Sequence, residues 1–93
     1  MSLNDQSTVV ASKEQVSCEV AGEAAILNLK TGDHYDLNPV GARVWKLIQE
    51  PRTFGELRGI LLGEYDVEAA RLESDMRELL GHLADLNLIE ITG

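Results

Sequence analysis

The sequence predicts an α+β domain in which a three-stranded antiparallel sheet is followed by three helices. Residues 16–37 alternate between apolar and polar side chains and are interrupted by tight turns, which is the pattern of half-buried strands. After Leu37 the apolar residues recur at three- and four-residue steps, which indicates helices. Asn38 and Pro39 join the two halves without a loop, so we expect a fixed angle between the sheet and the first helix.

The length of 93 residues bounds the chain to one domain. A domain of this size buries only about 60–65% of the surface of its unfolded chain, so it can build one modest core. Aromatic residues make up only 4% of the sequence, so that core must consist of Leu, Ile, Val and Ala. Residues 1–8 are polar and show no periodicity. We therefore expect a flexible tail over 1–8 and a folded domain over 9–93.

The net charge of −8, with eight basic and sixteen acidic residues, argues against a nucleic-acid partner. It suits either a basic peptide or protein partner or simply a well-solvated surface. Cys18 is the only cysteine, which excludes an internal disulfide and a cysteine-rich metal site. The sequence has no signal peptide and no apolar run near ~18 residues, so we expect a soluble cytoplasmic protein without membrane contact.

Three strands are predicted over 16–20, 25–29 and 35–37, joined by turns over 21–23 and 30–33. Such a series makes an antiparallel meander whose third strand lies at one edge. The residues whose alternation places them on the inward face are Val16, Cys18, Val20, Ala25, Leu27, Leu29, Tyr35 and Leu37. Ile26 is apolar on the other face, so we expect that both faces of the second strand can be covered. Cys18 is accordingly expected to be buried and inert.

The first helix is predicted to run from Pro39 to about Gln49, with Asn38 as its N-cap and Pro51 marking its end. Its apolar residues on one side are Val40, Val44, Leu47 and Ile48, beside Trp45. The second helix is predicted to begin at Phe54, because the spacing of Thr53 and Glu56 is that of a capping box.

The third helix gives the strongest periodic signal, from a cap at Asp66 to about Leu86. Its apolar stripe is roughly 120° wide at about 100° per residue, and consists of Ala69, Leu72, Met76, Leu79, Leu80, Leu83 and Leu86. Glu73–Arg77 and Glu78–His82 are spaced as solvent-side pairs. Asn87 can adopt the left-handed conformation that ends a helix, and residues 88–91 read as a short extended segment.

The pattern contains no catalytic constellation, so we expect a protein that is not an enzyme and that carries no cofactor or metal. His34 and His82 are far apart in sequence and neither has a neighbour at metal-ligand spacing. No glycine-rich phosphate-binding motif occurs.

Two other classes of small protein remain as alternatives to a peptide-binding module. A winged-helix regulatory module that reads DNA needs a basic recognition helix, whereas the outward face of the third helix carries mainly acids. An acyl carrier protein is small, acidic and helical, but it needs a serine at the start of a helix. Ser74 lies in mid-helix between Glu73 and Asp75, and three leading strands do not fit an all-helical fold.

Over residues 16–91 the order and spacing of a series of residues resemble those of the pyrroloquinoline-quinone biosynthesis protein D (PqqD) family. The residues that carry it are Leu37, Asn38, Gly41, Trp45, Leu47, Thr53, Leu57, Leu61, Tyr65, Asp75, Leu79, Leu80 and Leu83. The sequence departs from the family pattern at Glu50-Pro51 and at Asn87, both of which lie in predicted connections.

The resemblance implies a non-catalytic, winged-helix-like RiPP recognition element, that is, a domain that binds the leader of a ribosomally made precursor peptide. Such a protein delivers the leader either to a lasso-peptide leader peptidase, which we favour, or, as a PqqD-type chaperone, to a radical enzyme of cofactor biosynthesis.

The peptide-binding site is predicted in a cleft between the third strand and the third helix. An edge strand can accept an extended peptide as a further strand, and the apolar stripe can bind its side chains. The site residues predicted in this way are His34, Tyr35, Asp36, Leu37, Leu72, Asp75, Met76, Leu79 and Leu83. Asp75 is either a partner for a polar or basic group of the leader or one half of an i,i+4 pair with Arg71. The alternative is that no peptide binds in this cleft. In that case the apolar stripe of the third helix belongs entirely to the core, and the edge of the third strand is covered only by water.

Overall fold

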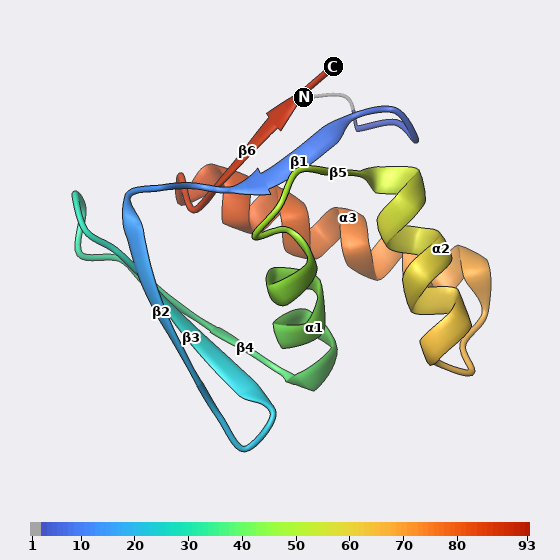
Figure 1. Ribbon diagram of the computed structural model, residues 1–93, viewed down its shortest axis with the longest axis horizontal. Helices are drawn as coiled ribbons and strands as arrows, with labels where there is room; N and C mark the ends of the chain where they lie inside the picture. Colours follow the sequence, from blue (N-terminus) through green and yellow to red (C-terminus); the bar gives the residue numbers. More distant parts are fainter. Residues whose placement is uncertain (1–2) are drawn as a thin grey trace.

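The computed structural model describes residues 3–93 (apart from the Val20 side chain), which form two antiparallel sheets and three helices (Figure 1). The elements are β1 (Thr8–Ala11), β2 (Gln15–Val20), β3 (Glu23–Asn28), β4 (His34–Leu37), α1 (Pro39–Leu47), β5 (Arg52–Thr53), α2 (Phe54–Glu64), α3 (Ala69–Asp85) and β6 (Ile89–Thr92). The predicted α+β architecture of three strands followed by three helices is confirmed as β2-β3-β4 and α1 to α3. No helix within residues 3–93 is long and apolar enough to cross a membrane.

A second sheet, with the order β5-β1-β6, was missed by the sequence analysis. It pairs Thr8 with both Thr53 and Thr92, so it joins the beginning, middle and end of the chain. The extended segment predicted over 88–91 is present as β6, whereas β1 and β5 were not predicted, because their pairing partners are distant in sequence. Figure 1 shows this sheet lying apart from the β2-β3-β4 sheet, at the end of the molecule where the chain finishes.

The expectation of a loose segment over 1–8 does not hold for residues 3–8, and residues 1–2 lie outside the described part of the chain. Thr8 belongs to β1, and Ser7 is 0% exposed. The Asp5 carboxylate accepts two hydrogen bonds from Arg58 of α2, at 2.8 and 2.7 Å. The segment binds the rest of the fold through these hydrogen bonds and an ion pair, and Leu3 packs against the hydrophobic core.

The β2-β3-β4 meander forms as predicted, but the sequence analysis reversed the faces of β3 and expected buried side chains on β2, whose residues 16–19 are all exposed. Ile26 is 1% exposed and faces the core, whereas Val16 and Leu29 are 50% and 59% exposed. Cys18 is also exposed, contrary to expectation. Alternation alone could not decide, because β3 is apolar on both faces and its buried face ends in a polar residue, Asn28. Asn28 is satisfied there by donating from Nδ2 to the Leu86 carbonyl, 2.9 Å away.

Two of the predicted helix starts are confirmed by their caps. The Asn38 side chain accepts from the Gly41 N–H at 2.8 Å. In the capping box, the Glu56 N–H donates to the Thr53 hydroxyl and the Thr53 N–H donates to the Glu56 carboxylate, at 3.1 and 2.9 Å. Helix α1 ends at Leu47, two residues earlier than predicted. A Cβ at Gly41 would lie 3.2 Å from Leu37 Cδ2, so glycine lets α1 start close against β4.

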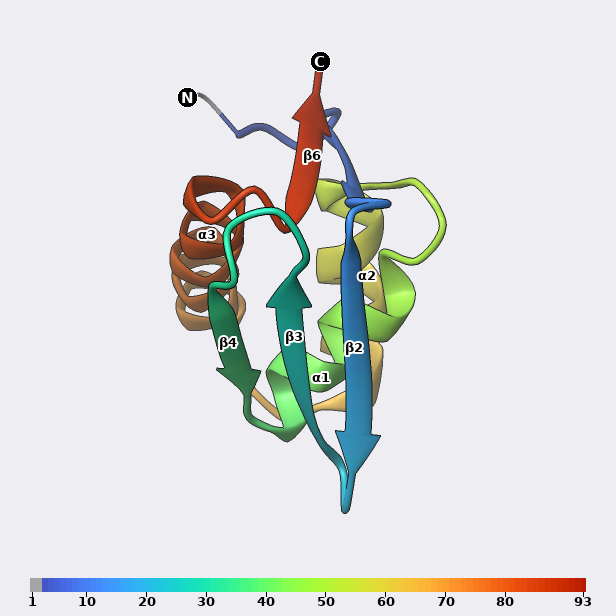
Figure 2. The same ribbon diagram turned by 90° about the vertical axis from the view of Figure 1, so that its left-hand side faces the viewer.

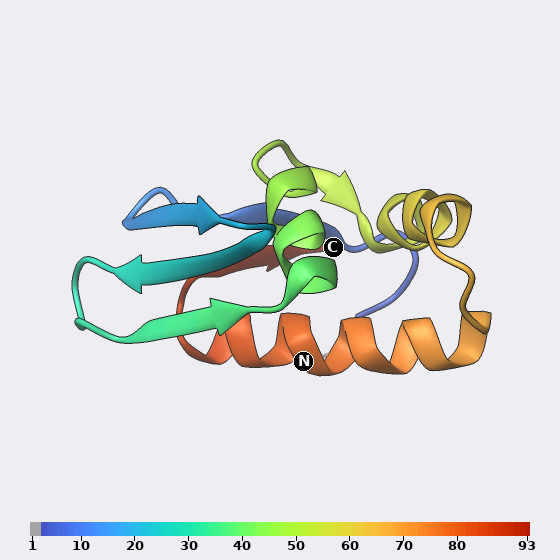
Figure 3. The same ribbon diagram turned by 90° about the horizontal axis from the view of Figure 1, so that it is seen from below.

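The third helix begins at Ala69, with Glu68 as its N-cap, so the predicted cap at Asp66 is wrong. Asp66 instead lies in the connection from α2 to α3. Four residues of the α3 stripe are buried in the core: Leu72, Met76, Leu80 and Leu83. Asn87 ends the helix with a φ of 58°, as predicted. Figures 2 and 3 show that α3 runs beside β4 and that α1 packs behind the β2-β3-β4 sheet. Strand β4 is therefore the strand of this sheet that lies next to α3.

Candidate peptide-binding groove between β4 and α3

The edge of β4 that faces away from β3 carries main-chain groups with which no strand in residues 3–93 pairs. The Asn28 N–H donates to the Asp33 carbonyl at 2.8 Å, and antiparallel pairs alternate from there between bonded and non-bonded. The N–H and C=O groups of Tyr35 and Leu37 therefore point to β3, and those of His34 and Asp36 point outward. We call this the open edge of β4.

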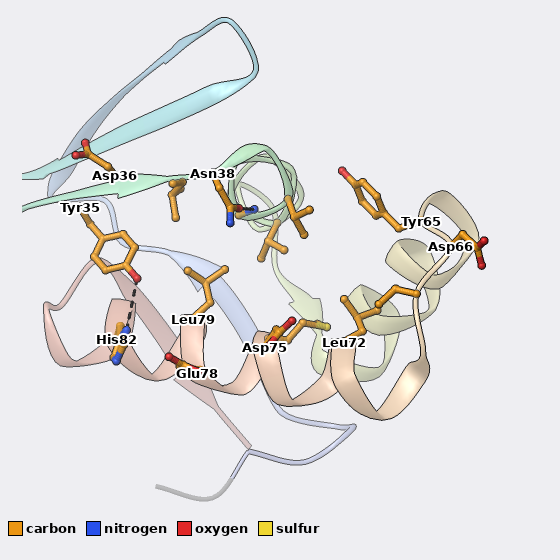
Figure 4. Close-up of a pocket in the computed structure, with 16 residues that line it drawn as sticks. Tyr35, Asp36, Asn38, Tyr65, Asp66, Leu72, Asp75, Glu78, Leu79 and His82 are labelled. Atoms are coloured by element: carbon orange, nitrogen blue, oxygen red, sulfur yellow. Dashed lines mark hydrogen bonds between the residues drawn. The ribbon is translucent and has the colours of Figure 1, made fainter.

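A groove of about 630 Å³ lies between the open edge and α3 (Figure 4). Helix α1 and the connection between α2 and α3 close its other sides. The residues that line it are Tyr35, Asp36, Leu37, Asn38, Val40, Gly41, Val44, Tyr65, Asp66, Val67, Leu72, Asp75, Met76, Glu78, Leu79 and His82. A volume of this size is within the range of small-ligand pockets and can hold several side chains of an extended peptide.

The floor of the groove is apolar and belongs to the core. Leu72 and Met76 are 4% and 2% exposed, so only a small part of each side chain reaches the groove. Leu79 is half-buried, and Val40 of α1 is 38% exposed. The groove therefore offers exposed apolar side chains above a rigid base, which is the arrangement that holds the anchors of a bound peptide.

Tyr35 and His82 meet across one end of the groove. The Tyr35 hydroxyl lies 3.4 Å from His82 Nδ1, and the two ring centroids are 6.3 Å apart. Figure 4 shows the Tyr35 side chain reaching from β4 toward α3. This contact links the two walls at the end of the groove opposite Tyr65 and Asp66.

The rim of the groove is acidic. Asp36, Asp66, Asp75 and Glu78 line it, and the lining includes no Lys or Arg. None of these carboxylates forms an ion pair with another residue in 3–93. The pair between Arg71 and Asp75 that the sequence allowed is likewise not formed among the described residues. By contrast, the predicted Glu73–Arg77 pair is present, at 3.7 Å.

Seven of the nine predicted site residues line the groove: Tyr35, Asp36, Leu37, Leu72, Asp75, Met76 and Leu79. His34 is exposed on β4 and lies outside the lining, although its main chain belongs to the open edge. Leu83 is 0% exposed and belongs to the core instead of the groove, because its position on α3 continues the buried row of Met76 and Leu80.

The sequence analysis missed the parts of the lining that come from α1 and from the α2–α3 connection. Val40 and Val44 were assigned to the buried side of α1, and Tyr65 and Val67 lie where helical periodicity ends. Glu78 and His82 could have been found, because they lie three and seven residues after Asp75 and so share its side of the helix.

Within residues 3–93 no group of three His, Cys, Asp or Glu side chains is placed to hold a metal ion. What the geometry offers is main-chain hydrogen bonding along one wall, apolar contacts below and negative charge along the other wall.

Comparison with known proteins gives consistent matches. The family model for coenzyme PQQ synthesis protein D (PqqD) matches residues 23–89. The solved structure of TbiB1 in complex with the TbiA(beta) leader peptide is 33% identical, with a TM-score of 0.80, and the match covers 87% of this chain and 94% of that one. A lasso peptide synthetase B1 complexed with the leader peptide has a TM-score of 0.75, covering 88% and 96% of the two chains; at 18% identity it supports the fold alone. No curated protein sequence matches.

Proposed function

This chain belongs to the PqqD family, and on that premise we propose that it binds the leader segment of a ribosomally made precursor peptide and delivers it to a processing enzyme. One observation carries the proposal: the open edge of β4 faces α3 across a groove with an apolar floor. An extended peptide that enters this groove can pair with β4 and bury its side chains at the same time.

In this binding mode the leader adds to β4 as a fourth strand of the β2-β3-β4 sheet. The main chain of His34 and Asp36 then supplies two N–H donors and two C=O acceptors. Each hydrogen bond of this kind stabilises a complex by about 0.5–1.5 kcal/mol. Because it forms between main chains, it gives affinity without selecting a particular peptide sequence. Because side chains alternate along a strand, every second leader residue points into the groove toward Leu79 and the side chains beneath it.

The proposed role is binding without catalysis, because an open strand edge above an apolar floor is suited to holding an extended peptide. Precursor peptides are made in the cytoplasm and a leader must be bound before it is removed, so we propose that the protein acts there. The receiving enzyme that we favour is a lasso-peptide leader peptidase, as the family resemblance of the sequence implied. The similarity to TbiB1, whose structure holds a leader peptide, supports the leader-binding step of this proposal.

A second candidate for the receiving enzyme is a radical enzyme of cofactor biosynthesis, which the description of the family model favours. The genes beside this one distinguish the two. A small precursor gene next to a protease and a cyclase supports delivery to a peptidase. A precursor gene next to a radical enzyme supports the second candidate.

The binding mode is tested by titrating a fluorescently labelled TbiA(beta) leader, and the leaders of precursors encoded beside the gene, against two variants of one residue. Asp36→Pro removes an N–H that points to the open edge, and edge strands tolerate proline there. Asp36→Ala keeps that N–H and removes only the side chain. We expect a loss of affinity of about tenfold or more for Asp36→Pro and a smaller loss for Asp36→Ala.

Thermal melts of both variants establish that they are folded. Equal affinities for the folded Asp36→Pro and Asp36→Ala proteins would contradict strand addition at this edge. If no leader binds the unaltered protein, the proposed function itself is wrong.

A further inference from the structure

We infer that the bound leader presents a Lys or Arg side chain to α3, where Asp75 and Glu78 together select for it. This inference rests on the proposed function and states which class of peptide the groove takes. It depends on where the unpaired carboxylates lie relative to the open edge of β4.

Asp75 and Glu78 lie three residues apart on α3, so they occupy neighbouring positions on one side of the helix. Both are exposed and both line the groove. Figure 4 shows the Asp75 carboxylate on the side of α3 that faces α1 and β4, with Glu78 one turn along, toward His82. The two carboxylates thus lie on α3, the wall of the groove opposite β4.

Two other acids of α2 and α3, Glu64 and Glu73, are already bound by arginines. Glu64 is bound by Arg43 at 2.6 Å, and Glu73 is bound by Arg58 at 2.9 Å. Asp75 and Glu78 have no such partner among residues 3–93, although Arg71 and Arg77 lie on the same helix. Neither arginine neutralises Asp75 or Glu78, so the groove side of α3 stays negative. Arg77 donates a hydrogen bond to the Leu3 carbonyl.

A strand added to β4 lies about 4.8 Å beyond it, within the space between β4 and α3. A long side chain on that strand can then cross to the rim of α3 while its apolar stem passes over Leu79. A bound peptide that covers Asp75 and Glu78 removes water from their carboxylates. Without a cationic partner this loss of hydration would oppose binding, so a Lys or Arg of the peptide is needed. A leader with an acid at the same position is repelled.

The test is a charge scan of the TbiA(beta) leader, in which each position in turn is made Lys or Glu, and affinity is measured for each pair of peptides. For the unaltered protein we expect one or two positions at which the Lys peptide binds at least about tenfold more tightly than the Glu peptide. In the double variant Asp75→Asn with Glu78→Gln, the ratio at those positions should fall to within about threefold of unity.

Asp85→Asn is the matched control, because Asp85 is exposed on the same helix but does not line the groove. It changes the net charge in the same direction and should leave the ratio unchanged. Binding without any position that discriminates Lys from Glu, or discrimination that survives in the double variant, overturns this inference and leaves the proposed function intact. Absence of binding by every peptide overturns the proposed function and, with it, this inference.

Discussion

The Tyr35 hydroxyl of β4 lies 3.4 Å from Nδ1 of His82 on α3, and this contact joins the two walls of the groove at one end. Strand and helix are 47 residues apart at this point, so the contact forms only in the assembled fold. The contact is exposed to solvent, and an exposed hydrogen bond contributes modestly to stability.

We expect Tyr35→Phe to lower the free energy of unfolding by no more than about 1.5 kcal/mol, because only the hydroxyl is lost. A double-mutant cycle with His82→Phe, followed by urea unfolding, measures the coupling between the two side chains. A coupling energy of about 0.5–1 kcal/mol agrees with the structure. Strict additivity would show that the contact contributes nothing to stability.

Leu79 and Leu83 lie one turn apart on α3 but in different environments, so truncating each should have a different effect. Leu83 is 0% exposed, and Leu83→Ala should cost about 2–5 kcal/mol of stability. Leu79 is half-buried and lines the groove, so Leu79→Ala should cost clearly less stability but at least about tenfold in leader affinity.

Paired urea melts and leader titrations of these two variants make the comparison. Met76 is too deeply buried to serve as a groove residue in this test, at 2% exposed. A large loss of stability for Leu79→Ala, with unchanged affinity in the folded fraction, would assign Leu79 to the core.

The ion pair of Asp5 with Arg58 should make stability depend on pH. The hydrogen bond from Arg58 holds the pKa of Asp5 below its ordinary value of 3.8. A carboxyl whose pKa is depressed by folding stabilises the fold above its ordinary pKa, and this contribution is lost as the pH falls through the folded-state pKa.

Asp5→Asn should therefore lower the urea midpoint at pH 7, and the difference from the unaltered protein should shrink as the pH falls below 3.8. Asp85→Asn, at an exposed position of α3, is the control and should show no such trend. A difference for Asp5→Asn that stays constant down to low pH would mean that the ion pair does not stabilise the N-terminal segment.

The capping box of α2 offers a test of a feature that the sequence predicted outright. Thr53→Ala removes the hydroxyl that accepts from the Glu56 N–H, and should cost about 0.5–2 kcal/mol of stability. Thr53→Ser keeps the hydroxyl and should cost much less. Chemical denaturation of both variants makes the measurement, and equal losses would point to the β1–β5 pairing of Thr53 instead.

Local signals succeeded at three positions where neighbouring residues decide the structure, although the helix cap predicted at Asp66 was wrong. Asn38 and Thr53 mark helix starts because each side chain caps an N–H three residues away. Asn87 takes a positive φ because its short polar side chain tolerates that conformation. These three positions depend on contacts within one turn, which a sequence shows directly.

Tertiary contacts decided the features that the sequence could not show. Strand β1 is defined by partners at Thr53 and Thr92, and Ser7 is buried by contacts with distant segments. The face of β3 that enters the core follows from where α1 packs, and so Ile26 is buried while Leu27 is 39% exposed. For the same reason the α3 side of the groove was predicted from periodicity, whereas its α1 side and the α2–α3 connection were not.

Amide hydrogen exchange of β4, residue by residue, tests the central claim most directly, because it reports which main-chain groups a bound leader engages. The N–H groups of Tyr35 and Leu37 point to β3 and should be protected both with and without the TbiA(beta) leader. Those of His34 and Asp36 point to the open edge, and should exchange freely alone and become protected at saturating leader. Binding of the leader that leaves His34 and Asp36 unprotected would contradict strand addition to β4.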